Sequence, residues 1–203
     1  MPFVSLDFDA AIKLAKYSAI QHFTETTWAQ GLVREMEPIT VIEVGSYGGG
    51  TLAWWAECLP KLLIGIDNEG RPNRDVIVQM LDGVLKAQEG GIGCFDVVGN
   101  SHDVDTFERV VGILDNNGGL EVDVLHIDAG HSYEEVREDW LTWKELVRPG
   151  GLVLFHDVAV SNEHPSQMVY KLIEDLVEEG RDVQTFIEPE MTIFAKGYGA
   201  VRV

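Results

Sequence analysis

Hydrophobic residues follow two alternating patterns along most of the chain. Short apolar runs that end in an acid or a glycine alternate with longer segments in which apolar residues recur every three or four positions. The first pattern is typical of buried strands and the second of amphipathic helices. The strand-like runs are VIEV (41–44), LLIGID (62–67), CFDVVG (94–99), VDVLHID (122–128) and GLVLFHD (151–157). Strands that alternate with helices predict an open, mostly parallel α/β sheet.

The last two β-rich runs differ from the others in their spacing. DVQTFIE (182–188) and MTIFAKG (191–197) are separated only by Pro189 and Glu190, which is too short for a helical crossover. They predict an antiparallel hairpin at the edge of the sheet. We therefore expect a Rossmann-like, doubly wound, mostly parallel seven-stranded sheet with a reversed C-terminal edge strand.

Helical patterns before and between the strands complete this picture. Apolar residues from Phe8 to Phe23, and then Trp28, Leu32 and Met36, predict two helices ahead of the sheet. We expect one domain over 1–203, in which 1–37 form a helical cap over the core of 38–203. Other predicted details are a helix that buries Leu52, Trp55, Ala56 and Leu59, with Trp54 exposed or at a subunit contact, and a helix that begins at Pro165.

Composition limits the class of partner. The formal net charge is −19 over 203 residues, which would repel a phosphate backbone and disfavours nucleic acid as a ligand. There is no apolar run of membrane-spanning length, and MPFVSLDFD lacks the basic start of a signal peptide. Cys58 and Cys94 are too few for a disulfide framework or a zinc site. We expect a cytoplasmic protein with a small-molecule partner and with scope for homo-oligomers.

A glycine-rich turn from Val41 to Thr51, VIEVGSYGGGT, joins the first strand to a helix. Such a turn forms a cradle for a small ligand at a helix N-terminus. It lacks the lysine of a phosphate-binding loop, and Gly45 is followed by Ser46 and Tyr47 instead of the second glycine of a dinucleotide fingerprint. Asp67 ends the second strand 22 residues after Gly45, where an acid can accept hydrogen bonds from ribose hydroxyls. The pattern indicates a nucleoside-like ligand without a pyrophosphate.

The combination of Glu43, the glycine turn and Asp67 resembles the class I S-adenosylmethionine-dependent methyltransferases. The resemblance implies S-adenosylmethionine as cofactor, with its methionine end at the first strand and turn and its ribose at Asp67. It also places the Asn100-Ser101-His102 turn beside the adenine, and we expect Asp128 at the cofactor as well. The cofactor-binding residues implied in this way are Glu43, Gly45, Ser46, Tyr47, Gly49, Asp67, Asn100, Ser101, His102 and Asp128.

Two further acids, Asp128 and Asp157, end the fourth and fifth strands, and each has a histidine nearby. Carboxylates that converge at one sheet edge repel one another unless a cation lies between them, and a hard divalent ion such as Mg²⁺ suits them. The stretch from His126 to Asp157 resembles the metal-assisted small-molecule O-methyltransferases of the macrolide-sugar and cephalosporin-tailoring type, methyltransferase family 24. That resemblance implies metal ligands at Asp128, His156 and Asp157, although His156 stands where those enzymes have an acid.

The same resemblance implies direct O-methylation of a small-molecule hydroxyl, with His131, three residues after Asp128, as general base. Three alternatives stay open at this point. One is a methyltransferase-like subunit that binds but does not catalyse, and another is a metal-independent methyltransferase that uses His131 alone. The third is a non-haem iron triad of His126, Asp128 and His156, which the alternation of strands and helices disfavours, because such triads normally lie in β-barrels.

Overall fold

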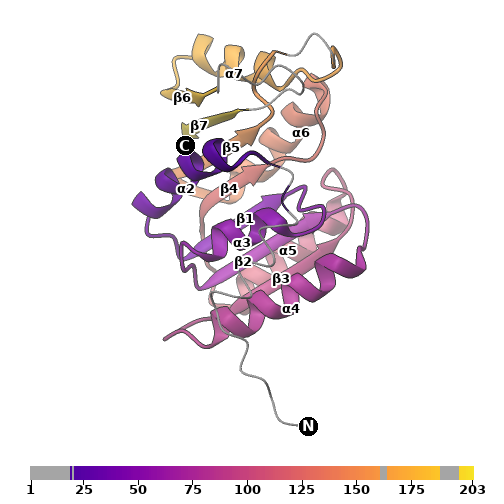
Figure 1. Ribbon diagram of the computed structural model, residues 1–203, viewed down its shortest axis with the longest axis vertical. Coiled ribbons are helices and arrows are strands. Elements are labelled where there is room, and N and C mark those ends of the chain that lie inside the picture. Colours follow the sequence, from indigo (N-terminus) through magenta and orange to yellow (C-terminus); the bar gives the residue numbers. More distant parts are fainter. Residues whose placement is uncertain (1–18, 20, 161–163, 188–196) are drawn as a thin grey trace.

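The computed structural model describes residues 19, 21–160, 164–187 and 197–203. It contains a seven-stranded sheet in the order β3-β2-β1-β4-β5-β7-β6 (Figure 1). The strands are β1 (Thr40–Val44), β2 (Leu62–Asp67), β3 (Gly93–Val98), β4 (Val122–Ile127), β5 (Val147–His156), β6 (Val183–Phe186) and β7 (Tyr198–Arg202). Strands β1 to β5 pair in parallel, so their carboxyl ends meet at one edge of the sheet. The predicted fold class is confirmed.

The reversed strand is β7, which pairs antiparallel with both β5 and β6. It therefore lies second from the edge, and β6 is the edge strand. The predicted hairpin exists, but its second strand begins at Tyr198, after the run 191–197 from which it was predicted. Residues 191–196 of that run lie outside the described residues, as does most of the predicted helix over 8–23.

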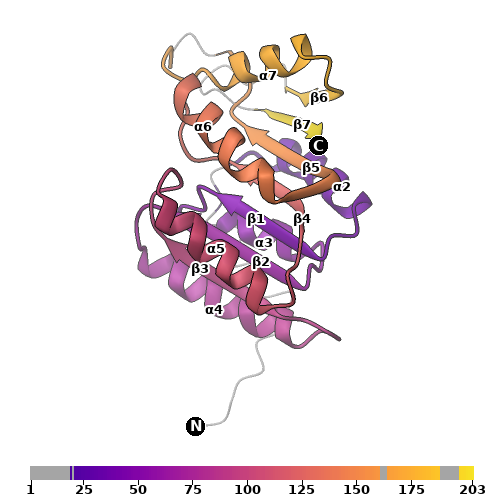
Figure 2. The same ribbon diagram turned by 180° about the vertical axis from the view of Figure 1, so that it is seen from behind.

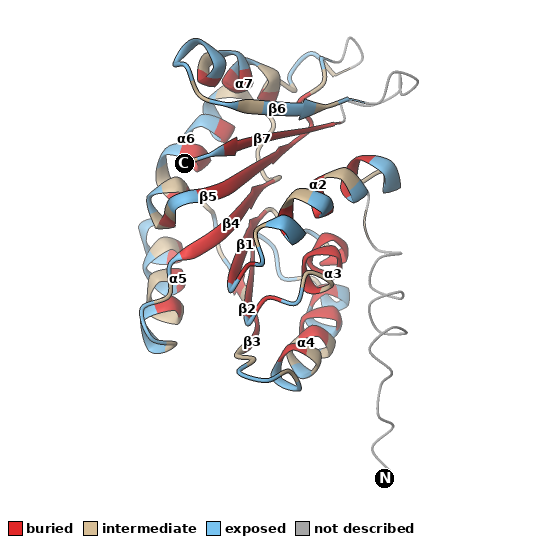
Figure 3. Ribbon diagram, turned by 90° about the vertical axis from the view of Figure 1, so that its left-hand side faces the viewer, coloured by how far each residue is buried: buried red, intermediate tan, exposed pale blue. Residues whose placement is uncertain are grey.

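Helices cover both faces of the sheet, as the side view shows (Figure 3). Figures 1 and 2 show the two sides in turn. One face carries α2 (Phe23–Glu35), α3 (Gly50–Ala56) and α4 (Pro72–Lys86). The other carries α5 (Val104–Asn116), α6 (Tyr133–Trp143) and α7 (Val169–Glu178), with the short 3₁₀ turn η1 (Lys144–Leu146) after α6.

Side chains along the strands alternate between these two apolar cores. Val41 packs with the core under α2, α3 and α4, whereas its neighbour Ile42 packs with the core under α5, α6 and α7, and both are fully buried. A strand covered on both faces favours apolar residues at most positions, and this explains why the central strands form long hydrophobic runs. Glu43 in β1 and His126 in β4 are buried polar exceptions, whereas Asp67, Asp128 and Asp157 come at the carboxyl ends of β2, β4 and β5.

Three predicted details of the helices are wrong. Trp54 is not at an exposed or subunit-contact position: it is 5% exposed and packs edge-to-face on Phe23 of α2, with ring centroids 5.3 Å apart. Leu59 is 55% exposed, because α3 ends at Ala56 and the chain turns at Leu59, whose φ is +57°. Pro165 lies in a turn, and α7 begins four residues later at Val169. The burial of Trp54 removes the sequence argument for a dimer.

Further local features concern the start of α6 and a buried cysteine. Ser132 and Glu135 form a capping box at the start of α6, in which the Ser132 hydroxyl accepts from the Glu135 amide at 3.3 Å. Cys94 is buried, and burial is the main reason why the pKa of its thiol is raised far above the ordinary range. Within the described ranges, no helix has both the length and the apolar character needed to cross a bilayer.

Candidate functional site

A cavity of about 720 Å³ lies at the carboxyl ends of the parallel strands. This volume is in the range of small-molecule sites, and the position is the one at which open parallel sheets bind ligands. The structure brings most of the predicted residues to its wall: Gly45, Ser46, Tyr47, Asp67, Asn100, Ser101, His102, Asp128, His131, His156 and Asp157. Glu43 and Gly49 do not line it.

The glycine turn after β1 is shaped by close backbone contacts. Gly45 has φ +94°, and a Cβ at this position would lie 2.1 Å from the backbone oxygen of Asp128. Its amide and that of Ser46 donate to the Ile66 carbonyl at 2.8 and 3.0 Å, which ties the turn to β2. Gly49, at φ +80°, is the N-cap of α3. It shapes the backbone of the turn and does not itself line the cavity. Only glycine fits at Gly45 without displacing β4.

Asp67 ends β2 beside this turn. Its Oδ2 accepts the Tyr47 amide at 2.7 Å, and its Oδ1 accepts the Glu69 amide at 3.1 Å. A carboxylate has about four lone-pair directions, so about two remain for a ligand. Asp67 can therefore accept hydrogen bonds from a pair of neighbouring hydroxyls, as the sequence predicts.

The structure corrects the assignment of Glu43 as a residue that contacts the ligand. Its side chain is completely buried, and its Oε1 lies 2.9 Å from Nδ1 of His126 and 3.3 Å from Nε1 of Trp55. Glu43 therefore supports the floor beneath the cavity instead of lining it. The same contact occupies His126, which is also fully buried, so the iron triad that included His126 is not formed.

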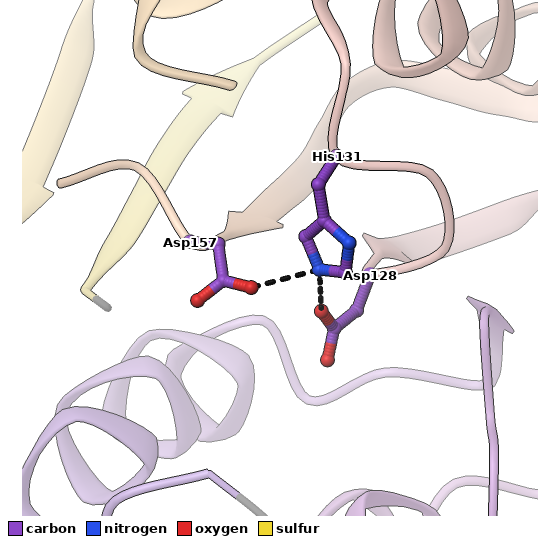
Figure 4. A group of neighbouring side chains, drawn as sticks. All are labelled: Asp128, His131 and Asp157. Carbon is purple, nitrogen blue, oxygen red and sulfur yellow. Dashed lines mark ion pairs between the residues drawn. The ribbon is translucent and has the colours of Figure 1, made fainter. Parts of the chain in front are cut away.

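Asp128, His131 and Asp157 converge in the same cavity, with the backbone of Asp128 against the glycine turn (Figure 4). Nε2 of His131 lies 2.8 Å from Oδ2 of Asp157 and 3.9 Å from Oδ1 of Asp128. The three side chains offer ligand atoms that all lie within 4.8 Å of one another. Asp157 has φ +59°, a strained conformation for this residue type, and such strain is common at functional sites.

The pKa values of this group reflect opposite charges at short range. Burial raises the pKa of Asp128, but the neighbouring histidines, His156 first, lower it more, to about 2. The pKa of His131 is raised, chiefly by its hydrogen bond to Asp157 and against the effect of burial. Asp128 is thus held as a carboxylate beside the imidazole of His131.

His156, which was predicted to be a metal ligand, instead lies between two carboxylates. Its Nδ1 lies 3.2 Å from Oδ1 of Asp128, and its Nε2 lies 3.0 Å from Oε1 of Glu25. Burial lowers the pKa of His156, but the surrounding carboxylates raise it well above the ordinary value. Both ring nitrogens are engaged, and the metal-capable group among the described residues contains His131 in place of His156.

Two residues of the site were not predicted. Glu25 on α2 is 1% exposed, and its carboxylate accepts the amides of His22 at 2.9 Å and Gly197 at 2.7 Å as well as contacting His156. Arg74 on α4 is fully buried behind Asp67. In the sequence, Glu25 is the acid of a capping box with His22 at the start of α2, and Asp96, the partner of Arg74, is the lone acid in the run CFDVV. Both are weak signals, because the partners of Glu25 and Arg74 are far away in the sequence.

The turn after β3 forms the wall at the side where adenine is expected. Asn100 Oδ1 accepts the His102 amide at 3.1 Å, and Trp143 Nε1 donates to the Ser101 carbonyl at 3.2 Å. His102 Nε2 lies 3.2 Å from Oδ1 of Asp139, which is fully buried on α6. Burial raises the pKa of Asp139 to about 6. Helix α6 therefore holds this turn against the cavity.

The fold and the cavity together define an α/β protein with a small-molecule-sized cavity at the carboxyl ends of its strands, lined by a glycine turn, Asp67 and an acid–histidine cluster. A family model described as "Methyltransferase domain", methyltransferase family 24, matches residues 42–158, which is more than half of the chain. The chain belongs to this family, and the resemblance inferred from its motifs is confirmed.

Curated relatives extend the match but carry no assigned activity. The uncharacterized protein R132 of Acanthamoeba polyphaga mimivirus is 28% identical over 147 residues, 70% of this chain and 62% of that protein. Protein y4gI of Sinorhizobium fredii is 41% identical over 51 residues, 25% of this chain and 6% of that protein. The chain thus spans less than two thirds of either relative.

Solved structures share the fold over nearly the whole chain. The O-methyltransferase TomG from Streptomyces achromogenes, in complex with S-adenosylmethionine, is 20% identical with a TM-score of 0.67, and the match covers 98% of this chain and 92% of TomG. Cofactor-bound Rv0187 from MTB is 19% identical with a TM-score of 0.66, and covers 99% and 92%. The mycinamycin-pathway methyltransferase MycE, in complex with Mg and S-adenosylhomocysteine, is 17% identical with a TM-score of 0.61, and covers 97% and 54%.

Proposed function

We propose that this chain is an S-adenosylmethionine-dependent O-methyltransferase that acts on a hydroxyl group of a small molecule. The observation that carries the proposal is the meeting of two groups in one cavity: the glycine turn with Asp67, and the cluster of Asp128, His131 and Asp157. Family membership supports methyl transfer, and TomG, Rv0187 and MycE, which share the fold, were crystallised with their cofactors.

The cofactor would lie along the first group. Asp67 would accept the ribose hydroxyls, the turn of Gly45, Ser46 and Tyr47 would hold the methionine end, and the turn of 100–102 would lie beside the adenine. When bound, S-adenosylmethionine supplies an electrophilic methyl group on a sulfonium. The contribution of the protein is to exclude water and to hold the acceptor and the donor in line, which can supply much of the rate acceleration.

A divalent cation fits the second group. Two buried or half-buried carboxylates and one imidazole nitrogen lie within 4.8 Å of one another, and oxygen ligands of this kind suit Mg²⁺. Asp128 and Asp157 would hold the ion, which when bound would lower the pKa of an acceptor hydroxyl. His131 would take the hydroxyl proton at Nε2, the nitrogen that faces both carboxylates.

A second candidate is a methyltransferase that needs no metal. It is favoured by one specific contact, the 2.8 Å pair of His131 Nε2 and Asp157 Oδ2. If Nε2–H donates to this carboxylate, Nδ1 is the unprotonated nitrogen and would be the base, oriented without an ion. In that case Asp128 would act on the orientation of His156 and His131.

Calorimetry with S-adenosylhomocysteine, followed by a methyl-transfer screen over hydroxyl-bearing small molecules, tests the proposal. We expect binding by the protein and transfer to at least one acceptor class, with activity lost in chelator and restored by Mg²⁺. Transfer that is insensitive to chelator would select the metal-independent enzyme. Binding without transfer over the whole panel would leave a catalytically silent binding subunit, and absence of binding would refute the proposal.

Three wider predictions remain to be tested with the same material. We expect a cytoplasmic location, and no nucleic-acid partner because the formal charge is −19. The third point is the oligomeric state, for which size measurement in solution would detect homo-oligomers.

A further inference from the structure

Arg74 lies fully buried in the first turn of α4, directly behind the cavity wall. Its Nη1 is 3.5 Å from Oδ1 of Asp67, and its Nε is 3.0 Å from Oδ1 of Asp96 on the neighbouring strand β3. The side chains of Asp67 and Asp96 are 11% and 16% exposed. One guanidinium therefore lies between two largely buried carboxylates, one of which faces the ligand cavity.

Local structure does not account for an arginine at this position. The first turn of a helix favours acids, because the positive end of the helix dipole disfavours a cation there. Burying a charged side chain is also costly unless it is paired. What compensates Arg74 is the pair of acids from β2 and β3, so its position depends on the ends of these strands.

The contacts leave the Asp67 carboxylate free to serve a ligand. Arg74 is within hydrogen-bond distance of Asp96, at 3.0 Å, whereas its nearest approach to Asp67 is 3.5 Å, so its attraction to Asp67 is mainly electrostatic. The hydrogen bonds to Asp67 come from the amides of Tyr47 and Glu69, at 2.7 and 3.1 Å. Arg74 thus restrains the carboxylate from behind without occupying the lone pairs that a ligand needs.

We propose that Arg74 is a positioning residue, which holds the Asp67 carboxylate in the orientation that accepts the ribose hydroxyls of a bound adenosyl ligand. The inference rests on the proposed function, because it assigns Asp67 to the ribose. Without Arg74, the attraction that restrains the Asp67 carboxylate from behind is lost, and as long as Asp96 is charged the two carboxylates also repel each other across the space that the guanidinium fills. Asp67 would then turn away or take up a proton, and in either case it would be a poorer acceptor for two hydroxyls.

The test compares two ligands by calorimetry: S-adenosylhomocysteine and its 2′-deoxyribosyl analogue. We expect the wild-type protein to prefer the ribosyl ligand by about tenfold, the effect of one hydrogen bond to a charged acceptor. The variant Arg74→Met with Asp96→Asn keeps the same formal charge around Asp67 and leaves no second buried acid unpaired. It should bind S-adenosylhomocysteine about tenfold more weakly and lose the preference.

Two further variants keep the outcome interpretable. Arg74→Lys retains the positive charge, so it should retain part of the preference for the ribosyl ligand. This variant also gives a result if the Arg74→Met, Asp96→Asn protein does not fold. Combining Arg74→Met and Asp96→Asn with Asp67→Asn should weaken binding no more than Asp67→Asn alone, because Arg74 acts through Asp67. Lys86→Met, on the same helix but in an exposed pair with Asp82, is the matched control and should bind both ligands as the wild type does.

The inference is overturned if the Arg74→Met, Asp96→Asn protein keeps the wild-type preference, or if it loses affinity for both ligands equally. A wild-type protein that binds neither ligand would instead refute the proposed function. The two failures are therefore distinguishable in one set of titrations.

Discussion

Nε2 of His156, at the end of β5, lies 3.0 Å from Oε1 of Glu25, a residue 131 positions earlier on α2. The other nitrogen of His156 faces Asp128, so a continuous chain of side chains leads from the helix that precedes the sheet to the acid cluster. Helix α2 is therefore part of the site and not only a cover over the core. The predicted helical cap thus contributes a buried acid, Glu25, that was not predicted from the sequence.

Glu25→Gln tests the importance of this connection. The carboxylate of Glu25 accepts hydrogen bonds from three groups, and a glutamine must turn its NH₂ toward one of these donors. We expect a loss of about 1–3 kcal/mol in the free energy of unfolding, measured in urea, and reduced methyl transfer with S-adenosylhomocysteine binding retained. Glu35→Gln, at an exposed position on the same helix, is the control. Equal stability of the two variants would contradict the argument.

Replacement of His131 by Ala removes the nitrogen that faces both carboxylates. We expect at least about a tenfold fall in turnover on any acceptor found in the screen, because general bases contribute this much or more. Affinity for S-adenosylhomocysteine, measured by calorimetry, should change little, because His131 is not among the residues that we assign to the cofactor. Unchanged turnover would exclude His131 from the reaction.

Gly45→Ala should disrupt the ligand turn. The new methyl group would meet the Asp128 carbonyl, and φ +94° is strained for alanine, which by itself costs about 1–3 kcal/mol. We expect a lower melting temperature and loss of S-adenosylhomocysteine binding. Gly112→Ala in α5, where no atom lies within 4 Å of the added methyl, should stabilise the protein by about 0.4–1 kcal/mol. If Gly45→Ala behaved like Gly112→Ala, the tight packing of the turn on β4 would be wrong.

Asp139→Asn should change how stability depends on pH. The folded-state pKa of Asp139 is raised to about 6 by burial, whereas an unfolded aspartate titrates near about 3.9. Between these pH values Asp139 is protonated in the folded protein and ionised in the unfolded chain. The free energy of unfolding therefore decreases as pH rises from about 4 to about 6, because ionisation favours the unfolded state. The effect has an upper limit on the order of 3 kcal/mol.

The Asn variant cannot titrate, so its stability relative to the wild type should rise over this interval and stay constant above it. Thermal unfolding at several pH values between about 4 and 8 measures the difference. Glu138→Gln, whose side chain is 59% exposed and which also faces His102, is the matched control and should show no such trend. A difference for Asp139→Asn that does not vary with pH would show that its titration is not coupled to folding.

The sequence was sufficient for features that depend on neighbouring residues along the chain. Strands β1 to β5 were recognisable because a sheet covered on both faces requires continuous apolar runs, and the turn at Gly45 because it needs a residue without a side chain. Asp67 and Asp128 were predictable because parallel strands deliver their last residues to the same edge.

Features that depend on distant partners were not predictable in this way. Trp54 lies on a side of α3 that does not face the sheet, but α2 covers this side. Only the tertiary structure shows that Trp54 is buried there. The family resemblance implied Glu43 as a cofactor contact, yet the pairing of β1 with β4 sets it against His126. Arg74 could not be recognised as a buried residue from the sequence, because its partners lie on two other strands.

The position of β7 has a consequence for the order of folding. This strand follows both of its neighbours along the chain, yet it inserts between β5 and β6, so neither neighbour can complete its pairing until residues 198–202 are available. Glu25 likewise depends on the Gly197 amide, 172 positions later. The part of the cavity built on Glu25 and His156 is therefore complete only after β7 has joined the sheet, so the formation of the pocket is coupled to closure of the sheet.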